Sequence, residues 1–159
     1  MTFSPDFAFY RDDRALGGPP DDAFWDAMKA EAGIEMDRRR DTYPKLVAKG
    51  RLSRVDADRE LRVWCAIAED WGAAQRSPGF PIATWTEMAH CLRREIALRR
   101  KFYPGWVEAG RIDAAEAEAR LLLVETWHDL LWHCNHPEAV AARAAVGRLR
   151  SERAIAHAA

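Results

Sequence analysis

One stretch of the chain occurs twice, sixty residues apart, and this duplication constrains the fold more than any other feature of the sequence. Residues 43–51 and 103–111 share the pattern Y-P-x-x-V-x-x-G-R. Around it, residues 25–71 align with residues 85–131 without a gap, and twelve of the 47 aligned positions are identical. Roughly three identities would be expected by chance from background residue usage. A unit of this size cannot bury its apolar face alone, so we expect the two copies to pack against each other.

Each copy of the pattern follows a stretch in which apolar residues recur at spacings of three and four, which is typical of one buried helix face. The first stripe consists of Trp25, Met28, Ala32, Met36, Arg39 and Tyr43. The second stripe consists of Trp85, Met88, Leu92, Ile96, Arg99 and Tyr103. The two stripes have the same offsets, so both copies are expected to begin with the same amphipathic helix.

The repeated pattern itself is expected to form the turn of a helical hairpin. Pro44 disfavours α geometry at Tyr43, so the first helix should end or kink there and a short turn should begin at the proline. Gly50 is the natural left-handed residue to close that turn. Ser53 then has the side chain of a helix N-cap, and Asp113 occupies the same position in the second copy.

These elements predict an all-α protein in which two tandem αα-hairpin repeats form a four-helix bundle with internal pseudo-two-fold symmetry. The hairpins are expected over residues 22–74 and 84–134, joined by a Pro- and Gly-containing linker loop at 75–83. Residues 1–21 predict an extended N-terminal arm, whose aromatic side chains pack on the body or insert into a partner. Residues 135–159 are Ala-rich and predict a C-terminal helix. Together these segments are expected to form one globular domain.

Composition limits the class of protein. The net charge of −1 provides no overall attraction to nucleic acid or to a membrane surface. Three cysteines without C-x-x-C spacing indicate free thiols in a reducing compartment. No apolar run approaches the roughly 18 residues of a membrane span, and the N-terminus lacks the pattern of a secretory signal. We therefore expect a cytoplasmic protein that makes no membrane contact.

Charged residues inside the two copies are the main candidates for a binding site. Arg39 follows Glu35 by four residues and lies on the apolar stripe, and the same holds for Arg99 and Glu95. A buried charge needs a partner, so one interpretation is a structural ion pair that fixes the register of the hairpins. The other interpretation is an anion- or phosphate-binding pocket. The candidate binding residues are Arg39, Arg40, Arg51, Arg99, Arg100, Arg111 and Trp106.

The sequence carries no motif that indicates catalysis. It contains no Gly-rich phosphate loop and no G-x-S-x-G, so we expect no enzymatic activity and no cofactor. Arginines interleaved with aromatic residues over 93–103 leave open a nucleic-acid-binding helical protein that uses the repeat arginines. His133, Cys134 and His136 leave a metal-binding helical protein as a more remote alternative, since packing at a His-rich helix end also explains them.

The longer pattern E-x3-R-R-x2-Y-P-x2-V-x2-G-R-[LI] resembles a motif of a known group of proteins. The first copy is carried by Glu35, Arg39, Arg40, Tyr43, Pro44, Val47, Gly50, Arg51 and Leu52. The second is carried by Glu95, Arg99, Arg100, Tyr103, Pro104, Val107, Gly110, Arg111 and Ile112. It is similar to a motif, usually present once, in small uncharacterised helical proteins encoded by bacteriophages and prophages. The resemblance covers the two repeats and implies a phage-type accessory or inhibitor protein, with no activity to carry over.

We therefore expect a small, non-enzymatic protein that acts by binding another protein, such as a host, defence or virion component. Seven tryptophans, an aromatic N-terminal arm and an Arg-bearing C-terminal segment favour this reading, because large aromatic side chains dominate protein interfaces. A homo-oligomer is also left open.

Overall fold

The computed structural model describes residues 2–7, 21–69 and 82–158, and these residues form five α-helices and no β-strand. The helices are α1 (Asp22–Ala48), α2 (Arg54–Ala68), α4 (Trp85–Glu108), α5 (Ala114–His133) and α6 (Pro137–Ala158). α1 pairs with α2 and α4 pairs with α5, each pair joined by one copy of the repeated turn. The predicted all-α class with two hairpin pairs is confirmed. No helix in these described ranges is long and apolar enough to cross a membrane.

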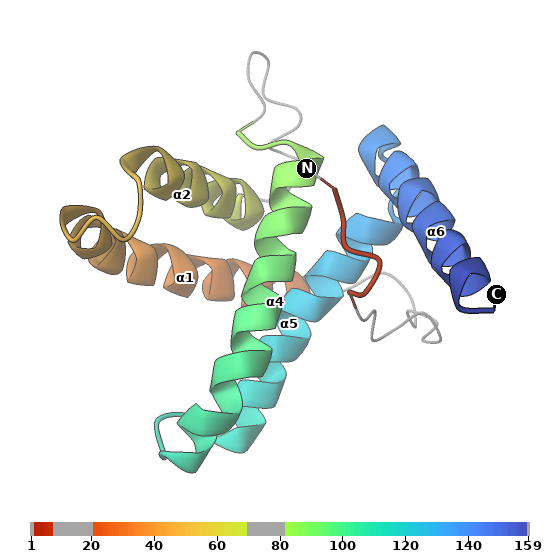
Figure 1. The fold of residues 1–159 in the computed structure, drawn as a ribbon. Helices are drawn as coiled ribbons and strands as arrows, with labels where there is room; N and C mark the ends of the chain where they lie inside the picture. The colour runs from red at the N-terminus through yellow and green to blue at the C-terminus, as the bar shows by residue number, and fades with distance from the viewer. Residues whose placement is uncertain (1, 8–20, 70–81, 159) are drawn as a thin grey trace.

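The two hairpins lie across one another rather than side by side (Figure 1). α2 packs on α4, and α1 packs on α5. α1 and α4 also meet through side chains, because Arg39 of α1 binds Glu95 of α4. α6 packs against α4 and α5. The core therefore lies where the hairpins cross, and the two hairpin turns lie at different extremities of the molecule (Figure 1).

Both hairpin turns use the same backbone hydrogen bonds. In the first turn the amide of Arg51 donates to the Leu46 carbonyl at 2.9 Å, and the amide of Gly50 donates to the Val47 carbonyl at 3.0 Å. The second turn repeats these bonds sixty residues later at 2.8 and 3.0 Å. Gly50 and Gly110 both have φ of 65°, the left-handed conformation that this Schellman motif requires. The predicted glycine cap is confirmed in both copies.

We expected the first helix to end or kink at Tyr43. The prediction that the helix ends at that residue is wrong. α1 continues through Pro44 to Ala48, and α4 likewise continues through Pro104 to Glu108. A proline removes one backbone donor from the helix. Here the proline lies within the last two turns, and the carbonyls that follow it accept hydrogen bonds from the Schellman motif that the glycine closes. The glycine therefore ends the helix and the proline does not.

Side-chain caps mark the beginnings of the following helices. Ser53 accepts a hydrogen bond from the amide of Asp56 at 3.0 Å, and Asp113 accepts one from the amide of Ala115 at 2.7 Å. Both predicted N-caps are thus confirmed. Thr84 begins α4 with a complete capping box, in which its hydroxyl and the Glu87 carboxylate each accept a backbone amide.

The predicted helix stripes form much of the core. All six residues of the second stripe are buried. In the first stripe, Met28, Ala32 and Arg39 are buried, whereas Trp25, Met36 and Tyr43 are half-buried. The first stripe is therefore less completely buried than the second.

The start of the N-terminal arm packs on the body of the protein. Phe3 is 8% exposed and stacks on His90 with 4.2 Å between ring centroids. Arg150 of α6 donates to the Pro5 carbonyl at 3.0 Å and holds the arm from the other side. Packing of the arm on the body is confirmed for residues 2–7, while its remaining aromatic residues lie outside the described residues.

Replacement of either turn glycine by valine should destabilise the protein. A β-branched side chain is strained at φ of 65°, so Gly50→Val and Gly110→Val should each lower the free energy of unfolding by more than about 1 kcal/mol. Chemical denaturation measures this change. Gly105→Ala is the matched control, because Gly105 lies within α4 with open space around it and alanine favours helix there. Equal stability of both valine variants and the wild type would contradict the turn geometry.

Candidate functional site

Four charged side chains from α1 and α4 meet in the interior, and we call Glu35, Arg39, Glu95 and Arg99 the buried ion network. Arg39 donates to Glu95 at 2.9 Å, and Arg99 donates to Glu35 at 3.0 Å. Each arginine also binds the glutamate four residues before it on its own helix. Every guanidinium thus joins the glutamate of its own hairpin to that of the other hairpin.

The network is almost completely shielded from water, since none of its four residues is more than 6% exposed. Burial opposes the positive charge of Arg39, but attraction to Glu95 and Glu35 outweighs burial and raises its pKa. Burial likewise opposes the charge of Glu95, and attraction and hydrogen bonding from Arg99 more than compensate and lower its pKa. The ionised forms of Arg39 and Glu95 therefore persist in the core because each charge faces opposite charges.

Further ion pairs between the hairpins flank the network. Glu31 of α1 accepts from Arg99 at 2.6 Å and from Arg120 of α5 at 3.0 Å. Glu60 of α2 accepts from Arg94 of α4. The comparison of the two copies did not select these residues, because none of them is identical between the copies. Of these residues, only Glu31 lies one turn from the network on the same helix.

The structure distributes the seven predicted binding residues over separate places. Arg39 and Arg99 are inside the buried ion network, and Trp106 is half-buried against Tyr103 with 5.6 Å between ring centroids. Arg51 and Arg111 are exposed at the two hairpin turns, which lie at different extremities (Figure 1). The seven residues do not converge on a common anion pocket. Arg40 lines an open cavity of about 460 Å³, and Arg99 and Trp106 line a smaller one of about 190 Å³.

The second arginine of each Arg-Arg pair has different surroundings in the two hairpins. Arg100 donates to Glu125 of α5 at 3.1 Å, and its side chain is 26% exposed. The position equivalent to Glu125 in the first hairpin is Cys65, which offers no carboxylate. Arg40 instead makes a 3.4 Å ion pair with the exposed Asp37, and its side chain is 59% exposed.

An open groove lies between the last turns of α1 and the first turns of α2, and we call it the α1–α2 groove. It is lined by Arg40, Tyr43, Pro44, Val47, Ala48, Arg54, Ala57, Asp58 and Leu61 and has a volume of about 460 Å³. Apolar side chains make up most of its surface, and the exposed Arg40, Arg54 and Asp58 surround them with charge. A cavity of this size can accept one or two side chains of a partner.

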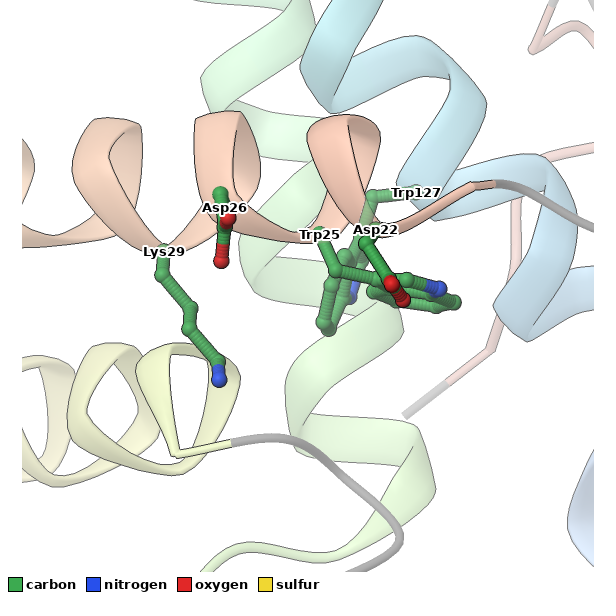
Figure 2. Close-up of a pocket in the computed structure, with 5 residues that line it drawn as sticks. All are labelled: Asp22, Trp25, Asp26, Lys29 and Trp127. Carbon is green, nitrogen blue, oxygen red and sulfur yellow. The ribbon is translucent and has the colours of Figure 1, made fainter.

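A second hollow of about 430 Å³ lies at the other end of α1. Figure 2 shows Asp22, Trp25, Asp26 and Lys29 projecting from the first turns of α1, with Trp127 of α5 beside Trp25. The two indole rings meet edge to face with 5.2 Å between centroids. Charged side chains of both signs dominate its edge, so it offers less apolar surface than the α1–α2 groove.

The histidines near the end of α5 have structural partners. His136 accepts the amide of Glu138 at 3.2 Å and so caps α6, and Cys134 donates to the Leu131 carbonyl at 3.1 Å. His128 is buried and accepts from Arg93 at 3.0 Å. In the parts of the chain that the structure describes, no group of three or more His, Cys, Asp or Glu side chains could hold a metal ion.

Comparisons of the chain with protein-family models, curated proteins and solved structures gave no match. The internal duplication supplies a comparison of its own, because two hairpins with the same turn differ around the groove. Where the first hairpin has Ala48, Arg54 and Asp58, the second has Glu108, Ala114 and Glu118. The groove edge is therefore more cationic in the first hairpin and more acidic in the second.

Removal of one arginine from the buried ion network should be strongly destabilising. Arg39→Met leaves Glu35 and Glu95 buried with fewer cationic partners, and loss of one member of a buried pair typically costs about 3–5 kcal/mol. Denaturant unfolding tests this value. Asp37→Asn is a suitable control, because it removes an exposed ion pair worth roughly 1 kcal/mol or less. A similar small effect for both variants would contradict a central role for the network.

Stability should also fall in mildly acidic solution because of His128. Burial lowers the pKa of His128 below its ordinary value of 6.5, partly offset by its hydrogen bond to Asp129. The unfolded chain regains the ordinary pKa and takes up a proton that the folded chain resists. The His128 contribution is therefore complete above pH 6.5 and is lost as the pH falls towards the folded pKa.

Thermal unfolding between about pH 7.5 and about pH 5.5 tests this expectation, since histidine titrates in that range. His128→Gln keeps an acceptor for Arg93 and does not titrate, so its melting temperature should decrease less over the range than that of the wild type. His90, whose pKa is also lowered by burial, is unchanged in the variant and accounts for the remaining slope. Identical slopes for the two proteins would exclude His128 as the cause.

Proposed function

We propose that this chain is a non-enzymatic protein that acts by binding another protein, with the α1–α2 groove as its docking site. The observation that carries the proposal is an apolar groove of about 460 Å³ that opens to solvent beside exposed charges. Apolar surface that remains open at a rigid helical hairpin is a common feature of interaction sites. Recognition of a helical or extended segment in such a groove relies on a few apolar anchors.

A comparison of the two hairpins supports this assignment. Tyr103 of the second hairpin is only 5% exposed, whereas Tyr43 at the same position of the first is half-buried and lines the groove. The two tyrosines lie in the same repeated pattern before the same turn. The first hairpin thus leaves open a tyrosine that the second hairpin buries.

A role as a phage or prophage accessory or inhibitor protein is part of the proposal. The motif resemblance supports it, and both an inhibitor of a host or defence protein and a virion accessory would need such a docking site. A cytoplasmic location agrees with the three free cysteines, Cys65, Cys91 and Cys134. Nucleic-acid binding by the repeat arginines has less support, since Arg39, Arg94, Arg99 and Arg100 all bind carboxylates of the chain itself.

We further propose that the two hairpins are duplicated copies related by an approximate two-fold axis in a four-helix core. The matching hydrogen bonds of the two turns support the duplication. The reciprocal pairs of the buried ion network, Arg39 with Glu95 and Arg99 with Glu35, exchange under such an axis. Packing of α2 on α4 and of α1 on α5 exchanges in the same way.

A tryptophan placed at the groove should abolish partner binding. Ala48 is exposed and lines the groove, so Ala48→Trp fills the cavity without entering the core. Affinity capture from host lysate, followed by mass spectrometry, should recover a partner with the wild type and about tenfold less with this variant. Glu108→Trp is the matched control at the equivalent exposed position of the second hairpin. A partner retained equally by both variants, or none with the wild type, would contradict the proposal.

A further inference from the structure

The chemistry of the groove follows from one difference between the two hairpins. In the second hairpin, Glu125 faces Arg100 from α5 and accepts from its Nη2 at 3.1 Å and from its Nε at 3.3 Å. In the first hairpin the same position carries Cys65, which is half-buried. The Cys65 thiol donates to Glu69 at 3.7 Å, on the side of α2 away from the turn. In the second hairpin a carboxylate on the neighbouring helix therefore neutralises the arginine. In the first hairpin a thiol stands in its place.

Arg40 and Cys65 lie close enough to influence each other. Burial and the nearby Glu69 raise the pKa of the Cys65 thiol, and the positive charge of Arg40 acts in the opposite direction. The positive charge of Arg40 thus acts at the position where the second hairpin has Glu125. Its ion pair with Asp37 is 3.4 Å long between two exposed side chains, which contributes little to holding it in place.

The other charges at the groove also favour an acidic ligand. Arg54 is 86% exposed, and its Nε lies 4.0 Å from Asp58, at the limit of an ion pair. Arg40 and Arg54 therefore outnumber the single carboxylate among the groove residues. An arginine guanidinium presents a planar set of donors that matches a carboxylate with two parallel hydrogen bonds.

We propose that the α1–α2 groove binds an acidic amphipathic segment of another protein, with an apolar side chain in the groove and a carboxylate on Arg40. This inference rests on the proposed function and specifies the partner's chemistry. The ligand carboxylate takes the place that Glu125 occupies beside Arg100 in the second hairpin. Arg40 is thus the specificity-determining residue, and the replacement of glutamate by Cys65 makes it available.

Selection of a displayed random-peptide library on the folded, full-length chain tests the proposal. Wild-type protein should enrich peptides that combine large apolar residues with Asp or Glu at helical spacing. Elution by excess free peptide and loss of capture by Ala48→Trp assign the binding to the groove. Arg40→Glu reverses the charge and should enrich peptides with Lys or Arg in place of the acids.

Cys65→Glu is the decisive variant, because it supplies the carboxylate that the second hairpin already has. The new glutamate should pair with Arg40 as Glu125 pairs with Arg100, and a selected acidic peptide should bind about 10- to 100-fold more weakly. Arg40→Gln should cause a similar loss while keeping a polar side chain without charge, and it tests the inference if Cys65→Glu does not fold. Circular dichroism confirms that each variant is folded.

The possible outcomes separate this inference from the proposed function. Enrichment of apolar peptides without acids, lost in Ala48→Trp but not in Cys65→Glu, would overturn the inference and leave the docking groove in place. If no enriched peptide is sensitive to Ala48→Trp, both are wrong. Self-association of the wild type that Ala48→Trp abolishes would assign the groove to a second copy of the chain and overturn the inference.

Discussion

The buried ion network is the interaction on which the rest of the structure depends. Four full charges lie in the core where the hairpins cross, and each is tolerable only because its partners come from both hairpins. A shift of one hairpin by a single residue would bury unpaired charges, which costs far more than a misplaced apolar contact. The network therefore selects one arrangement of the hairpins among those that apolar packing alone would allow. Its contribution is to specificity of packing more than to net stability.

The network also explains which positions of the duplication remain identical. Glu35, Arg39 and their counterparts form the network, and the Gly-Arg pair with the preceding valine forms the turn. Glu35 and Arg39 cannot change in one copy without loss of a partner in the other, and Gly50 cannot change without strain at the left-handed cap. Exposed positions around the groove face no such restriction. They differ between the copies in size and in charge, and this is where the two hairpins acquired distinct surfaces.

The sequence allowed prediction of the hairpins, the glycine caps and the location of the charged pairs, because each follows from local spacing. Crossing of the hairpins could not be predicted, since an apolar stripe indicates which face is buried but not the angle at which it meets its partner. Continuation of α1 through Pro44 was missed because the rule for residue Tyr43 describes a local preference. Packing and the hydrogen bonds of the Schellman motif outweigh that preference.

The candidate site could be predicted only in part from the sequence, because identical residues in the two copies have different partners. Arg40 and Arg100 were selected together because they are identical between the copies. The identity of the two arginines did not show that their partners differ. The informative position was a mismatch, Cys65 opposite Glu125, and its meaning required the observed pair between Arg100 and Glu125.

A second difference between the two copies accounts for the shape of the groove. Trp106 packs on Tyr103 in the second hairpin, and the smaller Leu46 stands at its place in the first. A larger ring at this position covers more of the tyrosine, which is consistent with the burial of Tyr103 and the partial exposure of Tyr43. Two of the differences between the copies thus affect the groove. Leu46 in place of Trp106 changes the apolar cover, and Cys65 in place of Glu125 changes the charge. The network fixes the hairpins through residues that are identical in the two copies, so these other positions can differ without loss of a buried ion pair.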